Sequence, residues 1–384
     1  MTQFGAVILA AGFSSRMGAF KPLLSLGGTT VLEYVVQTMC HAEITPVVVT
    51  GHKYAEIEAL AQKLKVETVH NPRFEEGMFT SIQSGFAYMA EKTFSGVFLL
   101  PIDIPMIRFS TLTFLQAEFM QNSALYDLWQ PTFNGRRGHP PLLKTGLVRK
   151  IAAMQNDTSL REALATLPPN RKCEVPVCDR YILRDMDYPA DYVALLSEFE
   201  SYDVLYPAEA YALLLKFRGD KPKLLRHSLK VMQVALRLAL ALKHKHVPIN
   251  VRLVQSCALL HDIGKGHPDH ACFSAELLAS MELPRMGYVT GCHSGFTLSQ
   301  GLCDFLKDDT LAAKVVFIAD KFVGSNSGDS LGTVDERFEA ARRRFGNDPE
   351  AARRIEHLHA EAKAVCAEIS ALLNQPIEDV VFRK

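Results

Sequence analysis

The feature that most limits the fold is a regular alternation of two hydrophobic periods between residues 6 and 103. Four short runs rich in β-branched and aliphatic residues alternate with three segments whose apolar residues recur at helical spacing. The runs read AVILAA, PVVVTG, VETVHN and GVFLLPID. Continuous apolar strands separated by helices indicate a mostly parallel sheet with helices on both faces. The sequence therefore predicts a Rossmann-like α/β domain, whose ligands bind beyond the carboxyl ends of the strands.

The first strand-like run leads into a loop of small residues that suits phosphate binding. Ala10, Ala11 and Gly12 follow the apolar residues, and Ser14 comes two positions later. Small residues allow backbone N–H groups to approach phosphate oxygens closely. The loop has neither the GxxxxGK[ST] pattern of a Walker A loop nor GxGxxG. It predicts a site for a nucleotide triphosphate of a different kind.

Charged residues accompany this loop and the end of the fourth run. Arg16 and Lys21 add positive charge for a triphosphate and for the charge that develops on a leaving pyrophosphate. Asp103 ends an apolar run, where a carboxylate can hold Mg²⁺ against the α-phosphate. For each residue alone, surface charge, a turn or a helix cap is the alternative. Their joint position at strand ends favours catalysis by all three.

The strand-like runs stop near residue 200, and every long segment beyond it has a helical pattern. A chain of 384 residues is also longer than one ordinary hydrophobic core supports. We therefore predict an α/β domain over 1–200 and an all-α domain over 201–384. The charges of the tail after residue 333 indicate a solvated helix face, on which His357 and His359 would lie without binding metal.

A set of His and Asp residues interrupts the apolar pattern of the helical half. His261 and Asp262 close an apolar helix, His227 lies in an amphipathic helix before it, and Asp320 lies inside an apolar run. A buried acid costs free energy unless it is paired or binds a metal. His270 and His293 supply two further imidazoles, although His270 could belong to a polar loop.

Composition excludes several classes of partner. Lys plus Arg equals Asp plus Glu at 42 each, so no basic field predicts nucleic-acid binding. The apolar runs are too short to span a bilayer, and the N-terminus has no basic leader. The eight Cys form no CxxC pair, which is typical of reduced thiols in a cytoplasmic protein. We expect a cytoplasmic enzyme without membrane or nucleic-acid partners.

Five segments of the first half carry a resemblance to a known family. They read LAAGFSSRMGAFKPLL, NPRFEEGMFTSIQSG, LLPIDIP, PTFNGRRGHPPLL and RDMDYPADY. Their order resembles that of the MobA-like nucleotidyltransferases, which attach CMP or GMP to molybdopterin-type cofactors. The resemblance covers about the first 195 residues, and the LAAG and GRRGHP segments look like the cytidylyltransferase branch. It implies CTP and a phosphorylated small-molecule acceptor as substrates, with a molybdoenzyme as a candidate protein partner.

The resemblance also implies roles for individual residues. Gly12, Arg16 and Lys21 would handle the triphosphate, and Asp103 would bind Mg²⁺. The residues expected around the nucleotide are Gly51, Asn71, Gly77 and Ser81. The residues expected on the acceptor side are Arg137, Gly138 and His139. Asp187 would lie near the metal or cap a helix, and both roles are open.

Two differences from the family pattern leave the acceptor open. Residues 156–161, NDTSLR, stand where the family has GDxGxR, and glycines there adopt conformations that Asn and Ser reach only at a cost. Ile104 stands where the cytidylyl branch often has Gln. A sugar phosphate or another alcohol phosphate is the alternative acceptor.

The His/Asp set of the second half resembles the ordered motif of HD-domain phosphohydrolases over about residues 224–324, with HDIGK as its most specific part. The residues that match are His227, His261, Asp262, His270, His293 and Asp320. Such a set could hold one or two divalent metals, and its mixed N and O ligands suit Fe, Mn, Zn or Co. Asp262 and Lys265 are the predicted catalytic residues, with Lys265 meeting phosphate charge. The alternative is that this half binds a nucleotide and regulates the transferase.

Overall fold

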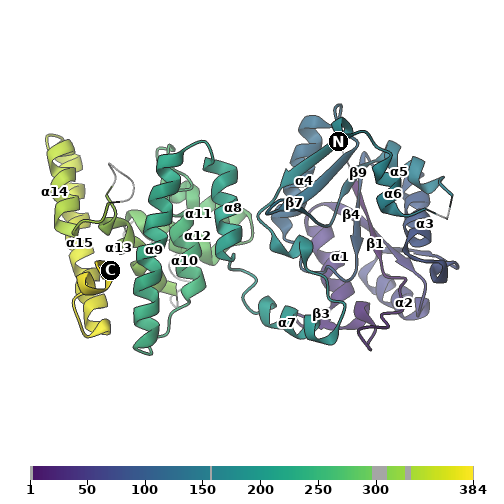
Figure 1. The fold of residues 1–384 in the computed structure, drawn as a ribbon, viewed down its shortest axis with the longest axis horizontal. Helices are drawn as coiled ribbons and strands as arrows, with labels where there is room; N and C mark the ends of the chain where they lie inside the picture. Colours follow the sequence, from purple (N-terminus) through teal and green to yellow (C-terminus); the bar gives the residue numbers. More distant parts are fainter. Residues whose placement is uncertain (1–2, 156–157, 296–308, 325–329, 384) are drawn as a thin grey trace. The chain divides into compact units, whose positions relative to one another are not determined.

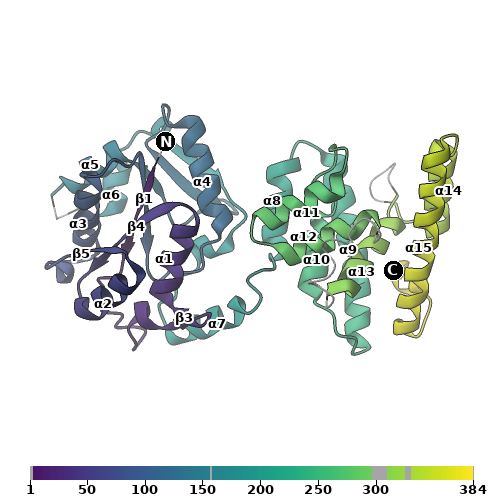
Figure 2. The same cartoon turned by 180° about the vertical axis from the view of Figure 1, so that it is seen from behind.

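The computed structural model describes residues 3–155, 158–295, 309–324 and 330–383. The chain divides into two compact units, Met1–Tyr202 and Asp203–Lys384. Figures 1 and 2 show the first unit as a sheet with helices and the second as helices. The predicted fold class, an α/β nucleotidyltransferase-type domain followed by an all-α region, is confirmed.

The main sheet of the first unit has the strand order β10-β7-β9-β6-β1-β4-β5, with β8 paired to β7. The strands of the alternating region, all paired in parallel as predicted, are β1 (Phe4–Leu9), β4 (Ile44–Thr50), β5 (Glu67–His70) and β6 (Gly96–Pro101). The later strands are β7 (Leu128–Phe133), β8 (Arg136–Arg137), β9 (Leu142–Lys144) and β10 (Lys172–Pro176). β9 pairs antiparallel with both β6 and β7, which makes the sheet mixed. A separate hairpin joins β2 (Ser25–Leu26) to β3 (Thr29–Thr30).

Helices cover both faces of this sheet (Figures 1 and 2). They are α1 (Val31–His41), α2 (Tyr54–Leu64), α3 (Met78–Ala90), α4 (Phe109–Asn122), α5 (Thr145–Ala152), α6 (Leu160–Ala165) and α7 (Pro189–Phe199). Val7 and Val97 face α3, α5 and α6 in one buried apolar cluster. Phe4 points to the other face, where its ring centroid lies 5.2 Å from that of Phe119 on α4. Because successive strand residues alternate between faces, both layers form from continuous apolar strands.

The second unit is helical throughout its described residues. Its helices are α8 (Pro207–Arg218), α9 (Pro222–His244), α10 (Val251–Leu260), α11 (His270–Ser280), α12 (Pro284–Gly291), α13 (Thr310–Phe322), α14 (Val334–Phe345), α15 (Pro349–Leu373) and α16 (Ile377–Val381). α9 packs against α10 and α13, and α14 packs against α15. The predicted apolar face of α9 is buried as expected, from Val231 to Leu242. None of the described helices is long and apolar enough to cross a membrane.

The prediction that His359 lies on a solvated face is wrong. This residue is only 9% exposed, and its ring stacks on Phe338 of α14. Its Nε2 lies 2.7 Å from Asp335 Oδ1, and Arg342 Nη2 lies 2.7 Å from its Nδ1. The charged pattern led to a wrong prediction because the two amphipathic helices α14 and α15 pack against each other, so some of their polar residues are buried between them. His357 is exposed, as predicted.

We propose that each unit folds independently, because each has its own buried apolar core. Fragments 1–202 and 203–384 should each be soluble and unfold cooperatively when expressed alone. Circular dichroism during thermal unfolding would check this, with the full chain as the reference. A fragment that shows no cooperative transition would indicate a core shared by the two units.

Candidate functional site

A cavity opens at the carboxyl ends of β1 and β6 in the first unit. We call it the strand-end cavity, and its volume is about 270 Å³. Its lining residues are Leu9, Ala10, Ala11, Gly12, Ser14, Lys21, Pro22, Phe74, Met78, Ser81, Pro101, Ile102 and Asp103. The structure therefore brings seven of the predicted nucleotide or catalytic residues to one wall, from segments far apart in the sequence.

The loop after β1 is held in place by its backbone and by one side chain. Ala10 donates its N–H to the carbonyl of Val49 at 3.0 Å, so this donor belongs to the sheet and is not available to a phosphate. Ser14 has a φ of 56°, and its Oγ accepts the backbone N–H of Lys21 at 3.1 Å. This bond holds Lys21 close to Ser14. The loop therefore presents a buried cation beside small residues, an arrangement suited to phosphate.

The cation of Lys21 joins two carboxylates at the edge of the strand-end cavity. Its Nζ lies 2.7 Å from Asp187 Oδ1 and 3.4 Å from Asp103 Oδ2. Arg16 donates to the other oxygen of Asp187 at 2.8 Å, from a side chain that is 65% exposed. Asp187 is bonded here, whereas the N-cap of α7 is Tyr188, whose backbone N–H donates to Asp191 Oδ2 at 2.9 Å. The structure thus favours the metal-side position for Asp187 over the helix cap.

The two carboxylates differ in their electrostatic surroundings. Burial raises the pKa of Asp103, and the neighbouring charge of Asp187 adds to this, although Lys21 opposes it. The hydrogen bond from Lys21 lowers the pKa of Asp187. A nearby cation stabilises the charged form of a buried carboxylate whose pKa is raised. Two oxygen donors close to a triphosphate-sized cavity fit Mg²⁺, which prefers oxygen ligands.

Four predicted nucleotide residues, Arg16 and three others, lie outside the lining of this cavity. Gly51 lies behind it, where an added Cβ would come within 2.7 Å of Phe74 and 2.9 Å of Ala11. Asn71 is fully buried, and its Nδ2 donates to Thr80 Oγ1 and Ser81 Oγ at 2.9 Å each. Gly77 is the N-cap of α3. These three residues shape the wall and hold Ser81 in the lining.

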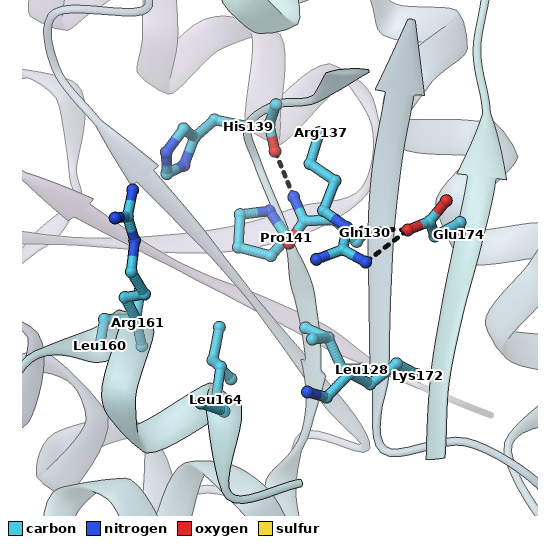
Figure 3. A pocket seen from close by; sticks show the side chains of 12 residues that line it. Leu128, Gln130, Arg137, His139, Pro141, Leu160, Arg161, Leu164, Lys172 and Glu174 are labelled. Carbon is cyan, nitrogen blue, oxygen red and sulfur yellow. Dashed lines mark hydrogen bonds and ion pairs between the residues drawn. The ribbon is translucent and has the colours of Figure 1, made fainter. Parts of the chain in front are cut away.

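A second cavity, of about 440 Å³, lies beside β7 and α6 (Figure 3). We call it the β7 cavity, and its lining residues are Leu128, Gln130, Arg137, Gly138, His139, Pro141, Leu160, Arg161, Leu164, Ala165, Lys172 and Glu174. All three predicted acceptor residues are among them. One side is apolar, and Arg161 and Lys172 add positive charge from other elements. Arg137 pairs with Glu174 at 2.6 Å from an exposed position. Such a lining suits a molecule with a phosphate and an apolar body.

His139 lines the β7 cavity and is influenced by the charge of Asp103, which lines the other cavity. Burial lowers the pKa of its imidazole, while the carboxylate of Asp103 opposes this shift. Its backbone N–H donates to the carbonyl of Ile182 at 2.9 Å. Among the described atoms, its Nδ1 is buried without a hydrogen-bond partner. A neutral imidazole thus lies between the β7 cavity, which it lines, and the charge of Asp103.

The close approach of the Ile182 segment makes Gly138 hard to replace. A Cβ at this position would lie 2.3 Å from the carbonyl oxygen of Ile182. We expect Gly138→Ala to destabilise the first unit by roughly 1–3 kcal/mol, as overpacking does elsewhere. Thermal unfolding of the variant would measure this. Gly146→Ala is the matched control, because Gly146 lies in α5 with nothing within 4 Å of an added Cβ. An unchanged melting temperature for Gly138→Ala would contradict the close approach.

In the second unit, the six predicted metal ligands come together from five segments. His227 comes from α9, and His261 and Asp262 follow α10. The others are His270 at the start of α11, His293 in the short helix after α12, and Asp320 in α13. We call these six residues the His/Asp cluster. All except His270 are buried.

The cluster contains two groups that share one carboxylate. His227, His261 and Asp262 form one group, and Asp262, His270 and His293 form the other. Asp262 Oδ2 lies 3.6 Å from His261 Nε2 and 3.9 Å from His227 Nε2. Asp262 Oδ1 lies 3.7 Å from His293 Nε2 and 3.8 Å from His270 Nε2. Asp320 joins the first group, with Oδ1 at 3.0 Å from His227 Nε2. Each oxygen of Asp262 thus faces its own pair of imidazoles.

The hydrogen bonds at Nδ1 of two imidazoles fit metal binding. His261 Nδ1 lies 2.8 Å from the carbonyl of Ala258, and His293 Nδ1 lies 2.7 Å from that of Thr290. A proton on each Nδ1 leaves the Nε2 lone pair directed at the cluster. His261 Nε2 is buried and has no hydrogen-bond partner among the described atoms. Burial would lower the pKa of His261, but Asp262 and Asp320 outweigh burial and raise it. Burial lowers the pKa of His293 to about 3, which keeps its imidazole neutral. The cluster therefore fits one or two divalent metals.

Two lysines lie against the carboxylates of the cluster. Lys265, which was predicted to meet phosphate charge, donates to Asp262 Oδ2, and its side chain is 55% exposed. Lys321 donates to Asp320 Oδ2 at 2.8 Å and to the carbonyl of His293 at 3.1 Å. We did not predict Lys321 as a site residue, because its position next to Asp320 was the only signal for this role in the sequence.

The mixed sheet with cations and carboxylates at its strand ends is typical of a nucleotidyltransferase. The His/Asp cluster is typical of a metal-binding helical domain. Comparison with known sequences specifies both. Residues 6–172 match the MobA-like NTP transferase domain, and residues 224–324 match the HD domain. The chain belongs to the MobA-like NTP transferase family, and it carries an HD domain in its second half. It is thus an enzyme with an NTP substrate.

Relatives of known name are distant. The molybdenum cofactor cytidylyltransferase of Escherichia coli K12 is 27% identical over 194 residues, which cover 50% of this chain and 95% of that protein. A "Probable molybdenum cofactor guanylyltransferase" of Bacillus cereus AH187 is 31% identical over 37% of this chain and 68% of its own.

Two solved structures are similar to the first half. One is a nucleotidyl transferase from Methanothermobacter, with 22% identity, a TM-score of 0.45, and coverage of 52% of this chain and 99% of its own. The other is a molybdopterin-guanine dinucleotide biosynthesis protein A from Archaeoglobus fulgidus, with 18% identity, a TM-score of 0.41, and coverage of 51% and 99%.

Proposed function

We propose that the first half transfers CMP from CTP to a molybdopterin-type cofactor and releases pyrophosphate. The proposal that the base is cytosine is supported by the LAAG and GRRGHP segments. The similarity to a cytidylyltransferase also spans more of that relative than the similarity to a guanylyltransferase does. The second half, in the same proposal, hydrolyses a phosphate ester or anhydride.

The observation that carries the transferase proposal is that the carboxylate lining one cavity, Asp103, acts on the imidazole lining the other, His139. Asp103 lines the strand-end cavity, which suits a triphosphate, and His139 lines the β7 cavity, which suits a phosphorylated apolar molecule. The charge of Asp103 acts on His139, so the two linings are electrostatically coupled. A nucleotide and an acceptor bound in these cavities would have their phosphates close together, as direct transfer requires.

In the proposed reaction, an oxygen of the acceptor phosphate attacks the α-phosphorus of CTP. The bond from this phosphorus to the oxygen that bridges to the β-phosphate breaks, and pyrophosphate leaves with that oxygen. Lys21 and Arg16 would leave their carboxylate partners and neutralise the triphosphate and the leaving group. Asp103 and Asp187 would then hold Mg²⁺, which supplies Lewis acidity at the α-phosphate when bound.

For the second half, the buried position of Asp262 between two pairs of imidazoles supports metal-dependent hydrolysis. The six residues of the His/Asp cluster would hold the metals, which supply Lewis acidity at the phosphate when bound. Lys265 is more than half exposed, so it could turn from Asp262 to a phosphate oxygen. Lys321, which is almost fully buried, would keep Asp320 oriented.

The proposal is tested with purified full-length protein. Each NTP is incubated with molybdopterin cofactor and Mg²⁺, and pyrophosphate release is measured. CTP should support the fastest release, and release that does not depend on the cofactor would reject this acceptor. In parallel, metal content and hydrolysis of phosphate esters are measured with added Mn²⁺, Fe²⁺ or Co²⁺. Nucleotide binding without hydrolysis under all these conditions would instead make the second half a regulatory module.

A further inference from the structure

A third cavity lies in the second unit, next to the His/Asp cluster. Its volume is about 450 Å³, and we call it the cationic cavity. Its lining residues are Lys221, Lys223, Leu224, His227, Lys265, Gly266, Arg337 and Arg344. The cations come from the start of α9, from the loop after α10 and from α14. Because His227 belongs to the cluster, the cavity opens directly onto the metal-binding residues.

The charge of this lining is uniformly positive. Five of the eight residues are Lys or Arg, and none is acidic. Only Lys265 has a carboxylate partner, Asp262. Among the described residues, no carboxylate lies within ion-pair distance of Lys221, Lys223, Arg337 or Arg344. Four cations without carboxylate partners line one cavity and repel one another, although three of them are exposed and Arg344 lies over the ring of Phe345. A polyanionic ligand would relieve that repulsion.

We propose that the HD site acts on molecules with a chain of two or more phosphates, and that Arg337 and Arg344 bind the phosphates farther from the cluster. This inference rests on the proposed phosphohydrolase function of the second half. A single phosphate carries at most two charges and would be satisfied by the cluster and Lys265. The additional cations have a role only if further phosphates extend from the cluster toward α14.

The two arginines lie outside the part of this chain that matches the HD domain. The match ends at residue 324, whereas α14 begins at Val334. The helical tail therefore acts as a specificity element added to the HD unit. Both the NTP substrate of the first half and the pyrophosphate that it releases belong to the proposed ligand class.

Hydrolysis of such a chain adds water across one anhydride bond. The water oxygen ends on one phosphorus, the bridging oxygen leaves with the other phosphate, and a proton is released to solvent. The arginines take no part in bond breaking in this scheme. They set which substrates bind, so their loss should affect substrates with several phosphates much more than monoesters.

The first test measures binding without turnover. Full-length protein in EDTA is titrated calorimetrically with inorganic tripolyphosphate, and the number of sites per chain is compared between variants. The Arg337→Ala/Arg344→Ala double variant should lose one site that the wild type has, with affinity at that site weakened roughly 10- to 100-fold. Arg343→Ala is the matched control, because this side chain is 82% exposed on α14 and does not line the cavity. Equal site numbers and affinities in all three proteins would overturn the proposal.

The second test compares substrates in the presence of Mn²⁺. For the double variant, we expect kcat/KM to fall about 10-fold or more with pyrophosphate, tripolyphosphate or CTP. Hydrolysis of p-nitrophenyl phosphate should change little. Faster hydrolysis of CTP than of tripolyphosphate would identify a nucleotide ligand, and the reverse an inorganic chain. Equal losses for the monoester and the chains would overturn the proposal. If no protein hydrolyses anything, the hydrolase function fails, and the titration still decides what the cavity binds.

Discussion

Asp262→Ala is expected to remove divalent metal from the second unit and to lower its hydrolytic activity by roughly 10³-fold or more. Asp262 is the carboxylate common to both groups of the His/Asp cluster, so its loss affects both metal positions. Burial would raise the pKa of Asp262, but the positive charge around it, including that of Lys265, outweighs burial and holds the pKa below its usual range. The carboxylate is therefore charged at neutral pH, as a metal ligand must be.

Metal analysis of purified wild type and variant, alongside hydrolysis assays, would check this expectation. Asp220→Ala is the matched control, because it removes an exposed carboxylate from the same unit. His293→Ala should be milder, since His293 belongs to one group only, and should leave about one metal per chain if the wild type holds two. Wild-type metal content in Asp262→Ala would contradict the shared role. Pyrophosphate release by the first half should be normal in all these variants.

The elements predicted most reliably from the sequence are those whose apolar residues form a long, single-period pattern. β1, β4 and β6 are fully or largely buried parallel strands, so their apolar runs are continuous and easily recognised, and β5 at the edge of the sheet is only partly buried. β7 to β10 were not predicted as strands. β8 and β9 are short, three of the four strands pair antiparallel, and β7 and β10 each contain a proline. The pairing of β10 with β7 and of β9 with β6 spans more than 30 residues of chain, which a local pattern does not encode.

The same limit applies to the candidate sites. Part of the His/Asp cluster could be predicted because His261, Asp262 and Asp320 interrupt or end apolar runs, where a polar residue needs a physical reason. The other three ligands were assigned through the ordered motif of the HD-domain resemblance. Arg161 and Lys172 could not be predicted, because an exposed cation in a sequence looks the same whether it lines a cavity or faces solvent. Arg337 and Arg344 were assigned to a solvated face for that reason. Asp187 needed the fold to bring it within 2.7 Å of Lys21, 166 residues away in the chain.

Asp103→Asn is expected to lower nucleotidyl transfer by roughly 10² to 10³-fold while the hydrolytic activity of the second half is unchanged. Asn has the same shape as Asp, so the wall of the strand-end cavity should keep its form. What is lost is a negative charge that is buried beside Asp187 and opposes the positive charge of Lys21. Without it, Asp187 alone would hold Mg²⁺, and binding of the metal in the presence of CTP should weaken.

Pyrophosphate release at saturating CTP and cofactor, measured over a range of Mg²⁺ concentrations, would separate these effects. A variant that recovers at high Mg²⁺ has lost metal affinity, whereas one that stays slow has also lost stabilisation of the leaving group. Asp185→Ala is the matched control, because Asp185 is exposed on the same segment as Asp187 and makes no ion pair with Lys21. Turnover of Asp103→Asn close to that of the wild type at every Mg²⁺ concentration would show that Asp103 is not a metal ligand. The transfer chemistry would then have to depend on Asp187 and the cations of the loop.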